Sequence, residues 1–266
     1  MTMVRIPTPP LPVRDRTGPR ALSPMLSRLA EERATGVLLR EYGMLYLAEG
    51  RVVHAESPLA PGLDVLLTAH GTLAATAWQW AAARTAGPPQ AAGLLLDSGL
   101  LPAGALELCH LDALYDAGYF ALAPSSTPGR FRYDSTPRPG PLPSVPVVAL
   151  ERETLRRRLL LHRLWPDPAV DGAPLIRADP AAATPLTPRQ RGVLDRVDGV
   201  RSAVEIARNL GRQAFHTLVD VRRLAAAGHV APATAGSARP APPPPPPVTD
   251  PDIALLKRLR DALEAL

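Results

Sequence analysis

The chain is short of lysine, aromatic residues and cysteine, and each shortage limits what it can be. Lys257 is the only lysine among the 30 basic residues of this 266-residue chain, and aromatic residues make up 4% of it. The formal charge of +5 is therefore carried by arginine, a bias typical of GC-rich coding sequences. That charge permits nucleic-acid binding without demonstrating it. A single cysteine, Cys109, excludes an internal disulfide and any multi-cysteine zinc site.

The motifs of nucleotide-binding and hydrolytic enzymes are missing as well. There is no GxxxxGK[ST], GxGxxG, GxSxG or HExxH, and the six histidines show no ligand spacing. His54 and Glu56 stand in an H-x-E arrangement, but a zinc deaminase also needs a pair of cysteines, so we expect a polar pair at a sheet rim. Cys109 lies in a predicted helix interior, where burial disfavours a thiolate. We therefore expect a non-enzymatic protein with no catalytic residue, no metal site and no cofactor.

No segment predicts a secretion signal or a membrane span. Residues 1–20 are rich in proline, glycine and arginine and contain no apolar core segment. Residues 65–83 carry no formal charge, but His70, Gly71, Gln79 and three threonines keep the mean hydropathy modest, which favours a soluble helix. We expect a cytoplasmic protein with no membrane contact.

The 33 prolines divide the chain into segments, because they concentrate at the N-terminus, at 124–146 and at 240–247. The prediction, in chain order, is a disordered N-terminus (1–18), an α+β domain (19–134), a linker with an Arg-rich helix near 150–165 (135–185), an all-α module (186–230), a proline-rich linker (231–249) and a C-terminal amphipathic helix (250–266).

The α+β domain is predicted from glycine-punctuated apolar runs. Three short strands, at 35–40, 44–48 and 51–55, form a meander in which Gly50 supplies a turn. A helix precedes them and helices follow through about residue 122, before a fourth strand at 129–133. The fold class is therefore α+β, a small antiparallel sheet with helices on one face. Leu38, Leu45, Leu47 and Val53 are expected to include the core positions, with Tyr42, Tyr46 and Arg51 as candidate partner contacts.

These residues carry a resemblance to a known family. The runs 35–38, 43–56 and 62–67, the element 93–101 and the strand 129–133 resemble the pattern of the PATAN-type domain, over roughly residues 20–134. Such domains are non-enzymatic interaction modules of bacterial signalling proteins. The whole layout is similar to that of actinobacterial proteins called transcriptional regulators. The resemblance implies that this domain binds a signalling protein.

Residues 186–230 predict three helices of a winged-helix-like module. Thr187 with Gln190, and Ser202 with Glu205, form capping boxes, and the third helix runs from about residue 212 to 227. Two short helices and a longer third are typical of the helix-turn-helix arrangement. A wing is not predicted, since at most one short strand, at 229–230, follows.

The third helix gives the leading hypothesis, a transcriptional regulator that binds double-stranded DNA. The predicted DNA-binding residues are Arg212, Gln213, His216, Thr217, Arg222 and Arg223. Asp220 and the missing wing favour the alternative, a signalling adaptor or scaffold that binds only proteins. In the 150–165 helix, Arg156, Arg157 and Arg158 are expected on a solvated face, with phosphate contact as the alternative. Leu155, Leu159, Leu160 and Leu164 form its apolar side.

The C-terminal helix is predicted to be an interaction element. Ile253, Leu256, Leu259 and Leu263 line one apolar stripe, which Leu266 continues. So short a helix is marginal alone in water, so it should fold against something. We expect it to bind another protein or a second copy of the chain. Packing on its own chain is the alternative.

Overall fold

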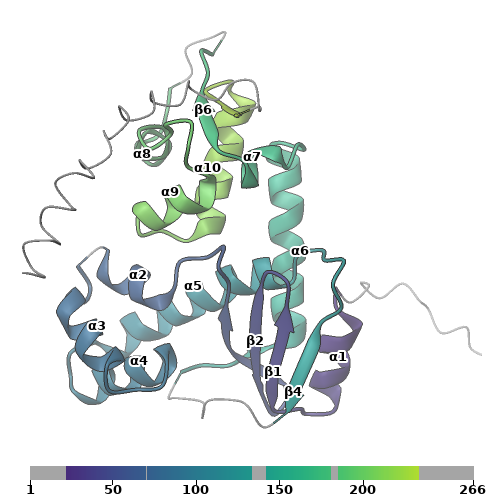
Figure 1. The fold of residues 1–266 in the computed structure, drawn as a ribbon, viewed down its shortest axis with the longest axis vertical. Helices are drawn as coiled ribbons and strands as arrows, with labels where there is room; N and C mark the ends of the chain where they lie inside the picture. Colours follow the sequence, from purple (N-terminus) through teal and green to yellow (C-terminus); the bar gives the residue numbers. More distant parts are fainter. Residues whose placement is uncertain (1–21, 70, 134–141, 181–184, 234–266) are drawn as a thin grey trace, which may run out of the picture.

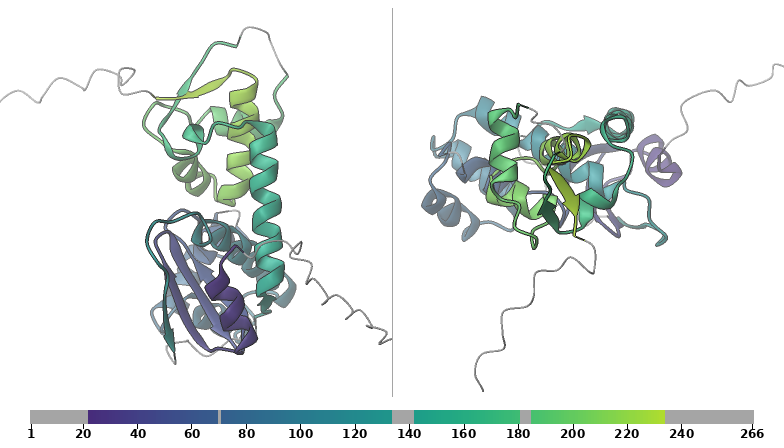
Figure 2. Two further views of the ribbon diagram at one scale, coloured as in Figure 1. Left: turned by 90° about the vertical axis from the view of Figure 1, so that its right-hand side faces the viewer. Right: turned by 90° about the horizontal axis from the view of Figure 1, so that it is seen from above.

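A computed structural model describes residues 22–69, 71–133, 142–180 and 185–233, and the fold is α+β (Figure 1). A sheet lobe at one end and a helical lobe at the other are joined by one long helix that runs beside both (Figures 1 and 2). The predicted fold class is confirmed for the small antiparallel sheet with its helices.

The sheet lobe is built on five antiparallel strands in the order β4-β1-β2-β3-β5. Leu45 and Leu47 of the second strand alternate with half-buried neighbours and lie on the face that packs into the core. A bulge between Tyr46 and Leu47 places Val52, not Val53, opposite Leu47, so the expectation that Val53 is a core position is wrong. The strands are β1 (Gly36–Arg40), β2 (Gly43–Ala48), β3 (Arg51–Glu56), β4 (Arg130–Tyr133) and β5 (Val145–Pro146).

Gly50 closes the turn between β2 and β3 and also touches the first helix. Its φ is +74°, a left-handed conformation that favours glycine. A Cβ atom at this position would lie 2.5 Å from the carbonyl oxygen of Ala30. The turn is thus fixed by backbone conformation and by close approach at once.

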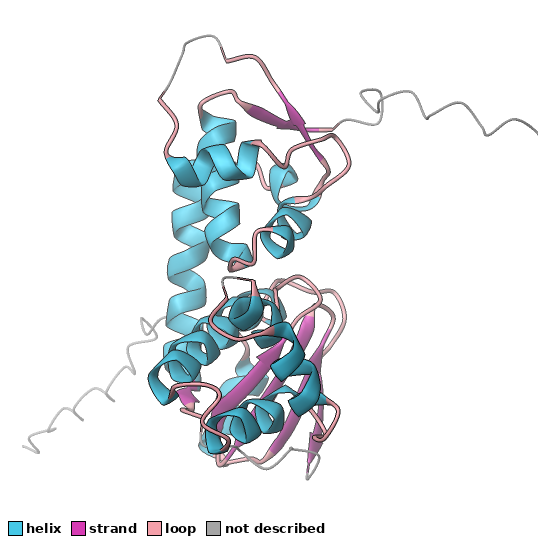
Figure 3. Cartoon of the chain, turned by 90° about the vertical axis from the view of Figure 1, so that its left-hand side faces the viewer, coloured by secondary structure: helices cyan, strands magenta, loops and turns pink. Residues whose placement is uncertain are grey.

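Helices cover one face of this sheet (Figure 3). The longest of them packs against β2 and β3, and three shorter helices form a second apolar cluster beside it. Ser23 caps the first helix by accepting a hydrogen bond from the N–H of Leu26. The helices are α1 (Pro24–Glu31), α2 (Leu63–Thr68), α3 (Ala75–Ala82), α4 (Pro88–Asp97) and α5 (Ala103–Ala121).

The connecting helix, α6 (Val147–Leu164), contacts α1 and α5 in the sheet lobe and the longest helix of the helical lobe. Gly118 of α5 allows its close approach, since a Cβ there would lie 2.7 Å from Leu150 Cδ1. Leu150 and Leu161 are both fully buried. One continuous apolar core therefore runs through both lobes.

The helical lobe contains three helices at the places predicted for the 186–230 module. Both predicted capping boxes are present, Thr187 with Gln190 and Ser202 with Glu205. The lobe comprises α7 (Ala169–Gly172), β6 (Leu175–Arg177), α8 (Pro188–Leu194), α9 (Ala203–Asn209), α10 (Ala214–Ala226) and β7 (Val230–Pro232).

Two expectations about this region are wrong. The stretch 166–185, expected to be linker, contains α7 and β6. The module is also not all-α, because β7 pairs with β6 in a two-stranded antiparallel sheet. The strands are short and lie far apart in sequence, so no local pattern identifies them.

Candidate interaction surfaces

The predicted DNA-binding residues on and beside α10 do not form one open face. Thr217 and Arg222 are buried and cannot reach a duplex in this arrangement. Arg212 and Gln213 are half-buried where the two lobes meet, while His216 and Arg223 are exposed. Most of α10 is enclosed by α6, α8 and α9.

Arg222 is a structural anchor in this arrangement. Its Nε lies 2.8 Å from Asp171 Oδ1 and its Nη2 lies 2.5 Å from Oδ2, a bidentate pair that joins α10 to α7. Its Nη1 donates to the carbonyl oxygens of Leu161 and Trp165, at the C-terminal end of α6. Each guanidinium nitrogen thus contacts a group of the protein itself, so in this arrangement the side chain is not open to the predicted DNA contact.

The N-terminus of α10 is capped by the other lobe. Its own N-cap residue, Gln213, makes no side-chain capping bond. The carboxylate of Asp116 on α5 accepts instead, from Ala214 N at 2.6 Å and from Phe215 N at 2.9 Å. Burial raises the pKa of Asp116 to about 6, although these two N–H groups and Arg157 act in the opposite direction.

Arg157 of α6 completes this joint. Its Nη1 lies 3.7 Å from Asp116 Oδ1, its guanidinium lies 4.5 Å from the centre of the Phe215 ring, and its Nε donates to Glu153 at 2.8 Å. The side chain is buried. One arginine therefore ties α5, α6 and α10 together.

The arginine run of α6 is thus not one solvated face. Arg156 is exposed and pairs with Glu153, as expected of a surface residue. Arg157 is buried, and Arg158 donates to the carbonyl oxygen of Leu122. The expectation of a solvated face is therefore wrong for Arg157, and the half-buried Arg158 is also engaged by the protein itself.

A cleft of about 350 Å³ between the lobes brings together Cys109, Asp112 and His216. These are residue types of nucleophilic catalysis, but no hydrogen bond joins any two of the three in the described part of the chain. Burial, and then the charge of Asp112, raise the pKa of the Cys109 thiol, which disfavours a thiolate. Cys109 lies in a helix as predicted, half-buried.

His54 and Glu56 form the polar pair expected of the H-x-E sequence. His54 Nε2 lies 3.1 Å from Glu56 Oε1, and the Tyr46 hydroxyl donates to the same carboxylate. Burial, with the Glu56 charge beside it, raises the pKa of Tyr46 to about 12. Burial lowers the pKa of His110, which stacks on His54, to about 4. The described residues contain no group of three or more potential metal ligands.

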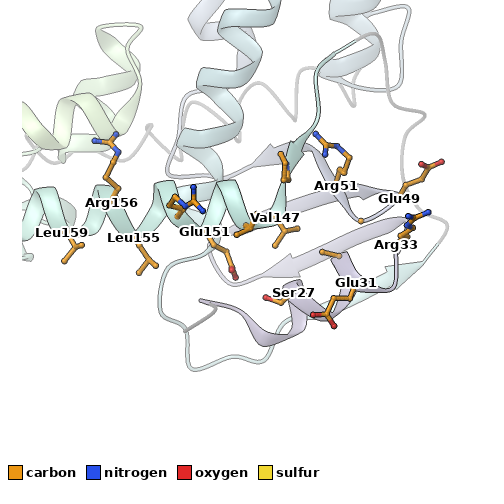
Figure 4. Close-up of a pocket in the computed structure, with 15 residues that line it drawn as sticks. Ser27, Glu31, Arg33, Glu49, Arg51, Val147, Glu151, Leu155, Arg156 and Leu159 are labelled. Carbon is orange, nitrogen blue, oxygen red and sulfur yellow. The ribbon is translucent and has the colours of Figure 1, made fainter. Parts of the chain in front are cut away.

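A groove of about 780 Å³ lies between α1, the β2–β3 turn and α6, and we call it the α1–α6 groove (Figure 4). Leu155 and Leu159 point from α6 toward the side on which α1 lies. Val148, which lies two helical turns before Leu155, is 61% exposed, and Leu159 is 55% exposed. Large apolar side chains so open to solvent, at helical spacing, indicate a surface that another element can cover.

Charged residues line the groove beside its apolar positions. Arg33, Glu31, Glu49 and Arg152 have no ion-pair partner among the described residues. Glu151 accepts a hydrogen bond from Ser23 N, so it also ties α1 to α6. The lining as a whole holds four arginines and three glutamates.

Sequence reasoning identified this helix but misjudged its faces. All four of Leu155, Leu159, Leu160 and Leu164 were expected on one apolar side. Leu155 and Leu159 instead line the groove, and Leu161 is a buried core residue. The helix also begins three residues before its expected start near residue 150, so Val148 was missed. The spacing of Val148, Leu155 and Leu159 along the helix was the sequence signal that could have identified this stripe. The four residues predicted for partner binding, Ile253, Leu256, Leu259 and Leu263, lie outside the described residues.

Comparisons with family models, with curated proteins and with solved structures find no match to this chain. Within the described ranges, no helix is both long enough and apolar enough to cross a membrane.

Proposed function

We propose that this protein is a non-enzymatic signalling adaptor that binds an amphipathic helix of a partner protein in the α1–α6 groove. The supporting observation is the apolar stripe of Val148, Leu155 and Leu159 along α6, in which Val148 and Leu159 are exposed and Leu155 is half-buried. Charges that lack ion-pair partners among the described residues border this stripe. In helix-in-groove recognition, an amphipathic helix places apolar anchors, spaced three and four residues apart, against such an apolar surface. The resemblance of residues 20–134 to PATAN-type interaction modules agrees with this proposal.

The enclosure of α10 favours an adaptor over a DNA-binding protein. A recognition helix must offer its N-terminal residues to the major groove. Here Asp116 holds the N-terminus of α10 against α5, and Arg222 is engaged by Asp171. DNA contact by α10 would require the lobes to part.

A second candidate is the DNA-binding transcriptional regulator. Arg189 and Arg191 on α8 and Arg223 on α10 are exposed, and such side chains can contact phosphates. Duplex binding by the full chain at 50 mM salt, followed by selection from a random duplex pool, separates the candidates. Enrichment of one sequence supports the regulator, and its absence supports the adaptor.

The adaptor proposal is tested by panning a displayed library of amphipathic helices against the full chain. We expect the selected helices to bind the wild type about tenfold more tightly than the Leu155→Asp variant, because a charge then faces the apolar stripe. Leu108→Asp is the matched control, since Leu108 is 63% exposed on α5 and does not line the groove. Equal binding to all three proteins would contradict the proposal.

A further inference from the structure

We propose that the groove is occupied in the free protein by the chain's own C-terminal segment, residues 250–266, which a partner must displace. This inference rests on the proposed function of the α1–α6 groove as a helix-binding surface. It adds the identity of one occupant and, with it, a means of regulation.

The apolar stripes of the groove and of the segment match in length. The groove follows α6 from Val147 to Leu159, about 18 Å at ~1.5 Å per residue. As a helix, Ile253 to Leu266 would extend about 20 Å by the same rise. A short amphipathic helix gains most of its stability from packing its apolar side, so it needs such a surface.

The chain between the described residues and the segment is long enough. Ala233 is held beside α7 by a hydrogen bond to Pro174 O, and α7 follows the C-terminal end of α6. α6 itself is about 27 Å long. The 20 residue steps from Ala233 to Ile253 can extend to about 66 Å, so even a route around the molecule is within reach.

The charges favour this segment over the N-terminal one. The groove lining holds four arginines and three glutamates, and residues 250–266 hold four acids and three bases, the opposite balance. Residues 1–21 carry four arginines against one aspartate, and their prolines oppose a helix. The C-terminal segment therefore suits the groove in charge and in helical pattern.

Intramolecular occupation makes the groove a regulated site. A tethered segment competes at high effective concentration, so it lowers the apparent affinity of every partner by the fraction of time the groove is filled. A partner helix, or a change of charge within the segment, then releases it.

The test places a photo-crosslinker on the segment of the full chain. Benzophenone is attached to Lys257→Cys in a Cys109→Ser background, so that the label has one site. Lys257 lies off the apolar stripe, so the label leaves the stripe intact. An equal mixture of isotopically heavy and light protein is irradiated, and adducts are mapped by mass spectrometry.

We expect adducts on α1 or on residues 147–159 of α6 within a single isotope form. Leu159→Asp should reduce their yield about tenfold, while Leu108→Asp, outside the groove, should leave the yield unchanged. Circular dichroism verifies the fold of both variants. The same benzophenone label, attached instead at Ala238→Cys in the linker, measures the background yield of adducts.

Three outcomes would overturn this inference. Adducts that join heavy and light chains would make a second copy the occupant. An adduct yield equal to the Ala238→Cys background would mean that the segment does not occupy the groove. An adduct yield that Leu159→Asp does not reduce would mean the same. If displayed helices still bind the groove in those cases, the adaptor proposal stands although this inference fails.

Discussion

Replacing Arg222 by alanine should destabilise the protein strongly without any ligand present. The change leaves the Asp171 carboxylate without its bidentate partner, and removes the donor to the carbonyl oxygens of Leu161 and Trp165. Loss of one member of a buried ion pair costs about 3–5 kcal/mol. Because the Asp171 side chain is 25% exposed, water screens part of this, and we expect about 3 kcal/mol.

Urea unfolding followed by circular dichroism measures this free energy. Arg223→Ala is the matched control, since Arg223 is the exposed neighbour and its loss should cost under about 0.5 kcal/mol. Arg222→Lys should recover only part of the stability, because an ammonium cannot make the bidentate contact. Combining Arg222→Ala with Asp171→Ala should cost less than the sum of the two single changes.

The result that would refute this reasoning is equal stability of Arg222→Ala and Arg223→Ala. If Arg222→Ala also weakened duplex binding and flattened its salt dependence, Arg222 would be a phosphate contact after all.

Three further changes test other parts of the structure. Burial raises the pKa of Asp116 from 3.8 to about 6. The protonated side chain therefore stabilises the fold at low pH, and this stabilisation is lost as the pH rises through 6. Relative to the Asp116→Asn variant, the wild type should therefore gain about 2–3 kcal/mol in free energy of unfolding when the pH falls from 7.5 to 4, as measured by urea unfolding. A difference between the two proteins that does not change with pH would contradict this prediction. Gly71→Ala should lower the free energy of unfolding by about 1 kcal/mol, because Gly71 has a positive φ but open space around it. Gly50→Ala should lower it by at least twice as much, because Gly50 has a positive φ and also lies against backbone. Ser202→Ala should cost about 1 kcal/mol in thermal unfolding, and no loss would mean that the capping box is not stabilising.

The features predicted correctly from the sequence are local ones. Thr187 and Ser202 cap helices with residues three positions away, and Gly50 turns a hairpin through its own φ. Each depends on a few consecutive residues, so spacing alone identifies it. The two capping boxes and the β2–β3 turn were predictable for this reason.

The features that were missed depend on partners distant in the sequence. Arg157 and Arg222 look like surface arginines, yet each is buried against groups from other helices. Asp116, which caps α10, lies 98 residues before Ala214, so no local pattern indicates this contact. The groove, likewise, exists only because α1 and α6 lie side by side. A spacing pattern gives the faces of a helix but not what covers them.

The continuous core has a consequence for how this protein can be dissected. Leu150, Leu161 and Leu218 belong to one apolar cluster shared by the sheet, α6 and α10. Cutting the chain after residue 134 would remove the cap of α10 from one piece and expose apolar surface on both. We expect a single cooperative unfolding transition for the whole molecule. Each activity is therefore best assigned by single substitutions in the intact chain, because neither half is a faithful copy of its part of the whole.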